Sequence, residues 1–145
     1  MNDDEKALAL LEKAAYKAQD ALEKTTHFKP FLMLLTDSGQ IEVYDNEEED
    51  ASKSYVLLEE KLRKRIEKND VDIIILAVDT MIPEKFVQDV KIGIRLYLEE
   101  KSQKNKKINA RYIYIPYVLV QDKDEKLYVT LHQPIPVGCP AEFIV

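Results

Sequence analysis

Few side chains in this sequence are suited to nucleophilic catalysis. Cys139 is the only thiol, and His27 and His132 are the only imidazoles. A thiol nucleophile needs a base within hydrogen-bond reach, so one hypothesis joins Cys139, His132 and Asp79 in a Cys–His–Asp arrangement. The alternative is structural, with a surface histidine at the end of a strand and a small apolar cysteine in a docked tail. We favour the structural interpretation.

Metal and cofactor sites have recognisable spacings, which this sequence lacks. A zinc site needs three or four closely arranged ligands, but the two histidines and one cysteine show no paired spacing. The acidic run 45–50 lacks the glycine and the final glutamate of an EF-hand loop. No P-loop, G-x-G-x-x-G, H-E-x-x-H or G-x-S-x-G motif occurs. We therefore predict no metal and no cofactor.

The charge balance argues against a polyanionic partner. The chain has 21 basic and 27 acidic residues, a net charge of −6. Nucleic-acid-binding domains usually carry a basic patch or stripe. The lysines of 101–107 and the basic cluster of 61–65 are accordingly interpreted as solvated surface. Nucleic acid is not predicted as a partner.

The N-terminus and the apolar runs indicate the compartment. The first five residues contain neither the basic nor the apolar segment of a signal peptide. The longest mainly apolar run, Ile73–Val78, is far shorter than the ~18 residues of a membrane span. A single cysteine leaves no internal disulfide. We expect a cytoplasmic protein with no membrane partner.

Hydrophobic periodicity divides the first half of the chain into two helices around a hairpin. Apolar residues spaced by three and four predict amphipathic helices over 3–24 and 52–69. The predicted stripes are Leu8, Leu11, Ala15, Ala18 and Leu22, widened by Ala7, Leu10, Ala14 and Ala21, in the first helix and Leu58, Leu62 and Ile66 in the second. The apolar runs 31–36 and 41–44 flank a glycine-bearing turn and predict a β-hairpin.

The second half of the chain is rich in strands. Residues 71–80 are β-branched and apolar on both faces, which predicts a central strand. Alternation predicts a half-buried strand over 91–99. A strand over 109–121 contains Pro116, which implies an edge position or a bulge. A further strand covers 126–132, and the proline-rich tail after it is predicted to be irregular, with its last three residues docked on the body.

This order of elements defines the predicted fold class. The length of 145 residues is typical of a single domain. Helices and strands follow as α-β-β-α-β-β-β-β, and successive strands are joined by hairpins. We therefore predict an α+β fold in which two amphipathic helices pack on an antiparallel sheet of five to six strands.

One face of the predicted sheet carries aromatic side chains. A turn at 122–125 would place Gln121 opposite Lys126, and in that register Tyr117 pairs with Thr130. The predicted binding surface consists of Arg95, Tyr97, Tyr117, Tyr128 and His132. Tyrosine and arginine are enriched at protein interfaces, so a protein partner or a homodimer is one interpretation. The alternative is that a helix covers this face.

Part of the chain resembles a known group of sequences. The matching residues are Pro30-Phe31, Asp37 with Gly39, Leu98-Glu99 and Pro116-Tyr117, spread over 28–120. With these residues the sequence resembles small uncharacterised bacterial α+β proteins that have a "PF…DG" hairpin and a "Py" strand. The element order is also similar to that of roadblock- or profilin-like domains. The first resemblance implies no activity, and the second is a likeness of topology alone.

These observations favour a cytoplasmic protein-interaction or regulatory module that self-associates. Two alternatives remain open. One is an enzyme with a pocket near Asp79, His132 and Cys139. The other is an inhibitor or immunity-type binding protein, which the acidic charge and small size would suit.

Overall fold

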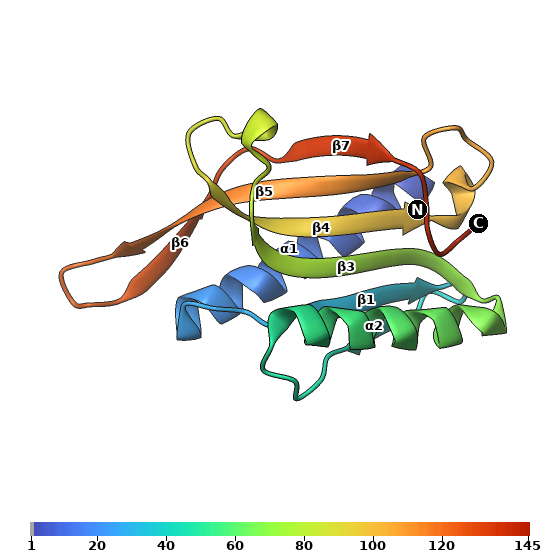
Figure 1. Cartoon of the computed structure of the whole chain (residues 1–145), viewed down its shortest axis with the longest axis horizontal. Helices are drawn as coiled ribbons and strands as arrows, with labels where there is room; N and C mark the ends of the chain where they lie inside the picture. Colours follow the sequence, from blue (N-terminus) through green and yellow to red (C-terminus); the bar gives the residue numbers. More distant parts are fainter. Residues whose placement is uncertain (1) are drawn as a thin grey trace.

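Seven antiparallel strands form one sheet with a helix on each face (Figure 1). The computed structural model describes residues 2–145. In chain order the elements are α1 (Asp3–Thr25), β1 (Phe31–Thr36), β2 (Ile41–Tyr44), α2 (Ala51–Arg65), β3 (Val71–Met81), β4 (Ile92–Glu100), β5 (Ala110–Gln121), β6 (Leu127–Leu131) and β7 (Ile135–Cys139). The strand order is β2-β1-β3-β4-β5-β6, and β7 also pairs with β5. The predicted α+β class and element order are confirmed, with β7 as an additional strand.

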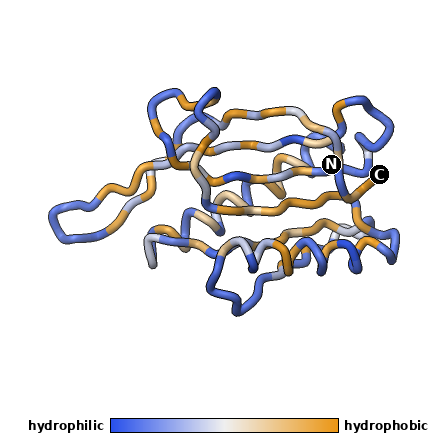
Figure 2. Tube along the Cα trace, viewed as in Figure 1, coloured by the Kyte–Doolittle hydropathy of each residue, from blue (hydrophilic) through white to orange (hydrophobic). Residues whose placement is uncertain are grey.

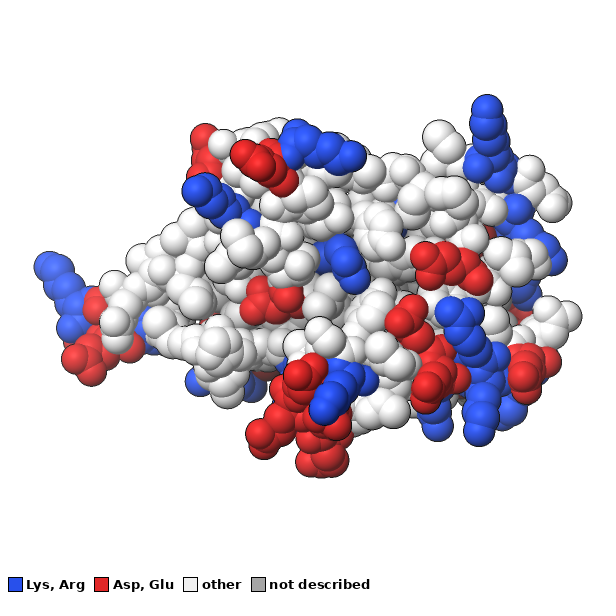
Figure 3. All heavy atoms as spheres, in the orientation of Figure 1, with Lys and Arg blue, Asp and Glu red and all other residues white. Residues whose placement is uncertain are grey.

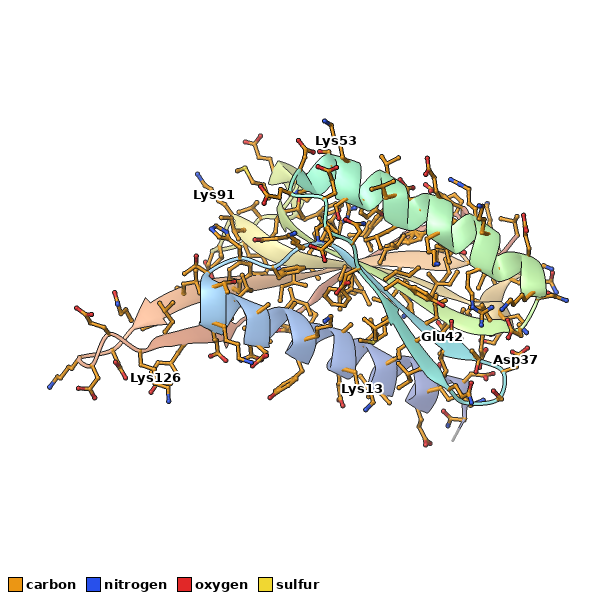
Figure 4. The ribbon with its side chains drawn as sticks, turned by 90° about the horizontal axis from the view of Figure 1, so that it is seen from below. Lys13, Asp37, Glu42, Lys53, Lys91 and Lys126 are labelled. Atoms are coloured by element: carbon orange, nitrogen blue, oxygen red, sulfur yellow. The ribbon has the colours of Figure 1, made fainter. Side chains whose placement is uncertain are left out.

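The central strand β3 separates two hydrophobic layers. Ile73 and Ile75 pack in the layer beneath α1, whereas Ile74 and Leu76 pack in the layer beneath α2. Figure 4 shows the two helices on opposite sides of the sheet. All four side chains are at most 2% exposed, which confirms a central strand covered on both faces.

The helix ends follow local capping rules. The Asn2 side chain accepts the N–H of Glu5 at 2.8 Å and caps α1. Asp50 caps α2 in the same way through the N–H of Lys53. A short 3₁₀ helix, Ile66–Lys68, extends α2 to Asn69, whose left-handed φ of 57° ends the helical segment.

The buried stripe of α1 differs from the one predicted. Its buried side chains are Ala7, Leu10, Ala14, Ala18 and Leu22, and Leu8 is 57% exposed. The helix therefore turns its alanine-rich side to the sheet. Small side chains let it lie close to bulky strand residues such as Ile75 and Ile94.

Strand β4 is buried on both faces rather than half-buried. Leu96 and Leu98 face α1, and Tyr97 and Glu99 are also buried on the other face. The difference arises because the C-terminal tail packs over the second face, where Phe143 is 5% exposed.

Glu99 fixes that C-terminal tail, whose docking was predicted. Its carboxylate accepts the backbone N–H groups of Glu142 at 2.9 Å, Phe143 at 3.1 Å and Ile144 at 2.6 Å. The hydroxyl of Tyr97 donates to the same carboxylate. Three consecutive backbone donors thus converge on one buried carboxyl group and tie the tail to β4.

The tail before these residues is regular, which corrects the prediction of an irregular segment. β7 pairs antiparallel with the first half of β5, and Pro136 lies opposite Ile113. β7 has no further partner in the described sheet, so a proline that cannot donate is tolerated there.

Pro116 marks the position where β5 changes partner. β5 pairs with β7 up to Tyr114 and with β6 from Tyr117 onward. The carbonyl of Pro116 accepts the N–H of His132 at 2.8 Å. In an antiparallel strand the N and the carbonyl of one residue face the same side, so the missing N–H points to the gap between β7 and β6. Pro116 therefore lies on a short unpaired stretch of the β5 edge, between the segments paired with β7 and with β6.

The β5–β6 hairpin has a different register from the predicted one. Gln121 pairs with Leu127, and Tyr117 pairs with Leu131. Glu125 adopts a left-handed φ of 62° between the hydrogen-bonded residues Asp122 and Lys126. This is the pattern of a three-residue loop closed by an αL residue, and it shifts the register by one residue. The shift places Leu131 rather than Thr130 opposite Tyr117, so an apolar side chain faces Tyr117 on the α1 side of the hairpin.

Candidate functional site

A groove beside Asp79 lies where the β5–β6 hairpin leaves the body of the sheet. It is a cavity of about 590 Å³ whose lining includes His27, Asp79, Ile92, Tyr117 and Leu119. A second cavity of about 590 Å³ shares His27 and Asp79 and extends toward the start of α2. We call the first cavity the Asp79 groove.

A hydrogen bond joins Asp79 and Tyr117 inside the groove. The hydroxyl of Tyr117 donates to Oδ1 of Asp79 at 2.7 Å. Burial raises the pKa of Asp79, although the Tyr117 hydrogen bond and the nearby His27 oppose the rise. Burial also raises the pKa of Tyr117, so the phenol is the donor at neutral pH. A carboxyl group of this kind in a cleft is suited to proton transfer or to hydrogen bonding with a ligand.

The raised pKa of Asp79 predicts a pH-dependent effect of Asp79→Asn. An acid whose pKa is raised by folding stabilises the protein most at low pH, and that contribution is lost as pH rises above its unfolded value, here near 3.8. The amide oxygen of the variant would still accept the hydrogen bond from the Tyr117 hydroxyl. Because the amide does not titrate, the variant would not lose this stability as the pH rises. The stability of the variant relative to wild type should therefore increase between acid and neutral pH, measured by urea unfolding. A relative stability that falls over the same range would show that Tyr117 and His27 stabilise the carboxylate more than burial destabilises it.

The hairpin itself exposes apolar side chains. Val118 pairs with Thr130 and Val120 with Tyr128 on the face opposite α1. Their exposed fractions are 37% for Val118, 45% for Val120 and 43% for Tyr128. The hairpin projects beyond both helices, and hydrophobic residues continue along it to a hydrophilic tip (Figures 1 and 2). We call these four residues the hairpin surface.

A third feature surrounds Arg95 on the face that carries α2. The guanidinium carbon lies 5.1 Å from the ring centre of Tyr112 and 5.5 Å from that of Tyr55. Tyr114 stacks between Tyr112 and Phe86, with ring centres 6.3 Å and 6.2 Å apart. We call these five residues the Arg95 cluster.

The structure does not gather the predicted binding residues on one surface. Tyr97 is 2% exposed and Tyr117 is 7% exposed, and they pack in opposite hydrophobic layers. Tyr128 lies on the hairpin, away from Arg95. His132 follows β6, where its backbone bonds to Pro116.

The hypothetical triad is also dispersed. Cys139 pairs with Ala110 at one end of β5, and His132 bonds to Pro116 six positions along that strand, roughly 20 Å away at 3.3 Å per residue. Asp79 meets His27 rather than His132 at its groove. Burial raises the pKa of the Cys139 thiol, which disfavours the reactive thiolate.

The sequence did not predict a role in these sites for five of their residues, which are His27, Tyr55, Phe86, Tyr112 and Tyr114. Tyr112 and Tyr114 had a usable signal, because they alternate on a strand that pairs with the strand of Arg95. Tyr55 and Phe86 come from α2 and from a 3₁₀ turn, and no local pattern relates either of them to Arg95.

Comparisons with protein-family models, with curated proteins and with solved structures found no match. Within residues 2–145, no cluster of three or more potential ligands is placed to hold a metal ion. In the same part of the chain, no helix has the length and apolar composition needed to cross a membrane. The Asp79 groove, the hairpin surface and the Arg95 cluster are therefore the candidate functional features.

Proposed function

We propose that this protein is an interaction module that pairs with a second copy of itself through the hairpin surface. The observation that carries the proposal is the exposure of Val118, Val120 and Tyr128 on the face of the hairpin opposite α1. Adjacent exposed apolar side chains are typical of interfaces. We further expect such a module to act in the cytoplasm.

The low net charge of the hairpin loop favours a second copy of the chain as the partner. The loop between β5 and β6, residues 122–126, contains three acidic and two basic side chains, whereas the chain as a whole carries −6. Two copies that meet through their β5–β6 hairpins would therefore bring together segments of low net charge, which repel each other little. A two-fold contact also uses the same surface on both copies.

Replacing Val118 and Val120 with lysine should abolish the association. The wild-type chain is expected to approach twice its 16.8 kDa mass as concentration rises through the micromolar range, measured by light scattering after size-exclusion chromatography. The double variant should remain at the monomer mass, because two ammonium groups would have to be desolvated at the contact.

A matched control is available on α2. Val56 is 51% exposed, so Val56→Lys also places a charge on an exposed valine without touching the hairpin. This control should associate like wild type. A wild-type mass that stays near that of one chain at all concentrations would overturn the proposal.

The Asp79 groove supports a second candidate function, an enzyme that uses proton transfer. The specific observation is the Asp79–Tyr117 hydrogen bond inside a cavity that His27 also lines. Turnover of an ester, amide or phosphate substrate by wild type, lost in a folded Asp79→Asn variant, would favour this candidate.

A further inference from the structure

Arg95 is held in place by rings from two different elements. It lies on β4, where its register partners are Val78 on β3 and Tyr114 on β5. The Tyr112 ring comes from β5, and the Tyr55 ring comes from α2. Aromatic faces attract a guanidinium and restrict its orientation. The side chain is therefore positioned before any ligand arrives.

The charge of Arg95 has no protein counter-ion among residues 2–145. The ion-paired arginines in this part of the chain are Arg65, which bonds to Glu42 and Asp70, and Arg111, which bonds to Glu100. In addition, Nε of Arg95 is buried without a hydrogen-bond acceptor. A buried donor left unpaired is uncommon and destabilising, so this N–H favours an acceptor supplied by a ligand.

The immediate surroundings of Arg95 are aromatic, with Glu59 near Tyr55 and Glu142 near Tyr112. In the view of Figure 3, uncharged atoms surround a basic group near the middle of this face, and acidic groups lie nearby. Burial raises the pKa of Tyr55 to about 12 and also raises that of Tyr112. Both phenols are therefore neutral at physiological pH and available as hydrogen-bond donors.

The shape and charge of the site favour a carboxylate over a phosphate. A guanidinium binds a planar carboxylate edge-on through two parallel hydrogen bonds, which suits a group flanked by rings. The net charge of −6 opposes a dianion more strongly than a monoanion. A single charge is also all that Arg95 can neutralise.

The rest of the ligand can be inferred from the aromatic row. Phe86, Tyr114 and Tyr112 stack in sequence beside the guanidinium at interplanar angles of 29° and 26°. Tyr114 is 7% exposed, so the accessible rings of the row are those of Phe86 and Tyr112, which suit a hydrocarbon or aromatic body attached to the anion. We propose that the Arg95 cluster binds an organic monocarboxylate, with its anion on Arg95 and its apolar body on the row. The proposal does not depend on association through the hairpin.

The test uses 4-phenylbutyrate as the probe and its amide, 4-phenylbutanamide, as the uncharged control. Titration of the ¹⁵N-labelled full chain should shift the Nε–H signal of Arg95, with a Kd on the order of 1 mM for a ligand of this size. The amide should bind at least tenfold more weakly, because it lacks the charge.

Two variants test the two parts of the site. Arg95→Gln should weaken phenylbutyrate binding at least tenfold, whereas Lys64→Gln, which removes an exposed charge on α2, should not. Phe86 lies in a surface 3₁₀ turn, so Phe86→Ala should leave the chain folded and weaken phenylbutyrate binding several-fold. This variant tests the proposal even if Arg95→Gln does not fold. Equal binding of acid and amide would overturn the proposal. Inorganic phosphate binding more tightly than phenylbutyrate at the same signal would overturn the carboxylate assignment.

Discussion

Ile75→Ala should lower the free energy of unfolding by about 2–5 kcal/mol. The side chain is 0% exposed and lies on β3 between Met33 of β1 and Leu98 of β4. Truncation removes buried methylene groups and leaves a cavity beneath α1 that neighbouring strands cannot easily fill. Urea unfolding followed by circular dichroism measures the loss directly.

The matched control is Ile41→Ala on the edge strand β2. Ile41 is 43% exposed, so the same change there should cost less than about 1 kcal/mol. A loss below about 1 kcal/mol at Ile75 would contradict its position in the central layer.

Glu99→Ala is expected to destabilise the chain by about 3–5 kcal/mol. The variant leaves the backbone N–H groups of Glu142, Phe143 and Ile144 without their acceptor, together with the hydroxyl of Tyr97. Because these donors are buried or partly buried, water replaces the lost carboxylate only where the tail detaches. Hydrogen exchange should therefore show faster exchange of these three amides than in wild type.

Two further variants distinguish loss of the C-terminal tail from the general effect of removing a negative charge. Glu142→Ala removes an exposed carboxylate nearby but keeps the backbone donor, and it should change stability by less than about 0.5 kcal/mol. Phe143→Ala removes the buried anchor of the same tail. Combined with Glu99→Ala, it should cost less than the sum of the two, because both variants release one segment. Additive losses would indicate that Glu99 acts independently of the tail.

Local patterns were sufficient for most of the elements. The periodicity of 3–24 and 52–69 predicted both helices, since a helix that packs on a sheet must present an apolar stripe. The apolar run 71–80 predicted a doubly covered central strand, because only burial on both faces tolerates such a sequence.

Long-range pairing decided the remaining features. β7 exists because β5 offers an unpaired edge to a tail whose prolines argue locally against a strand. The left-handed residue Glu125 set the hairpin register, which placed Leu131 opposite Tyr117 and turned Tyr128 to the other face of the hairpin. A shift of one residue turns every side chain of a strand to the other face.

In the candidate sites, too, local sequence and tertiary structure determine different features. The sequence alone identified Asp79, Tyr117 and Arg95 as chemically capable residues, because charge and hydrogen-bonding capacity are properties of each side chain. Their partners come from distant segments, as with the Asp79–Tyr117 hydrogen bond between β3 and β5 and the Tyr55 ring that α2 places over Arg95. Which groups meet depends on strand order and helix placement. These are set by the packing of the whole core, so only the tertiary structure decided them.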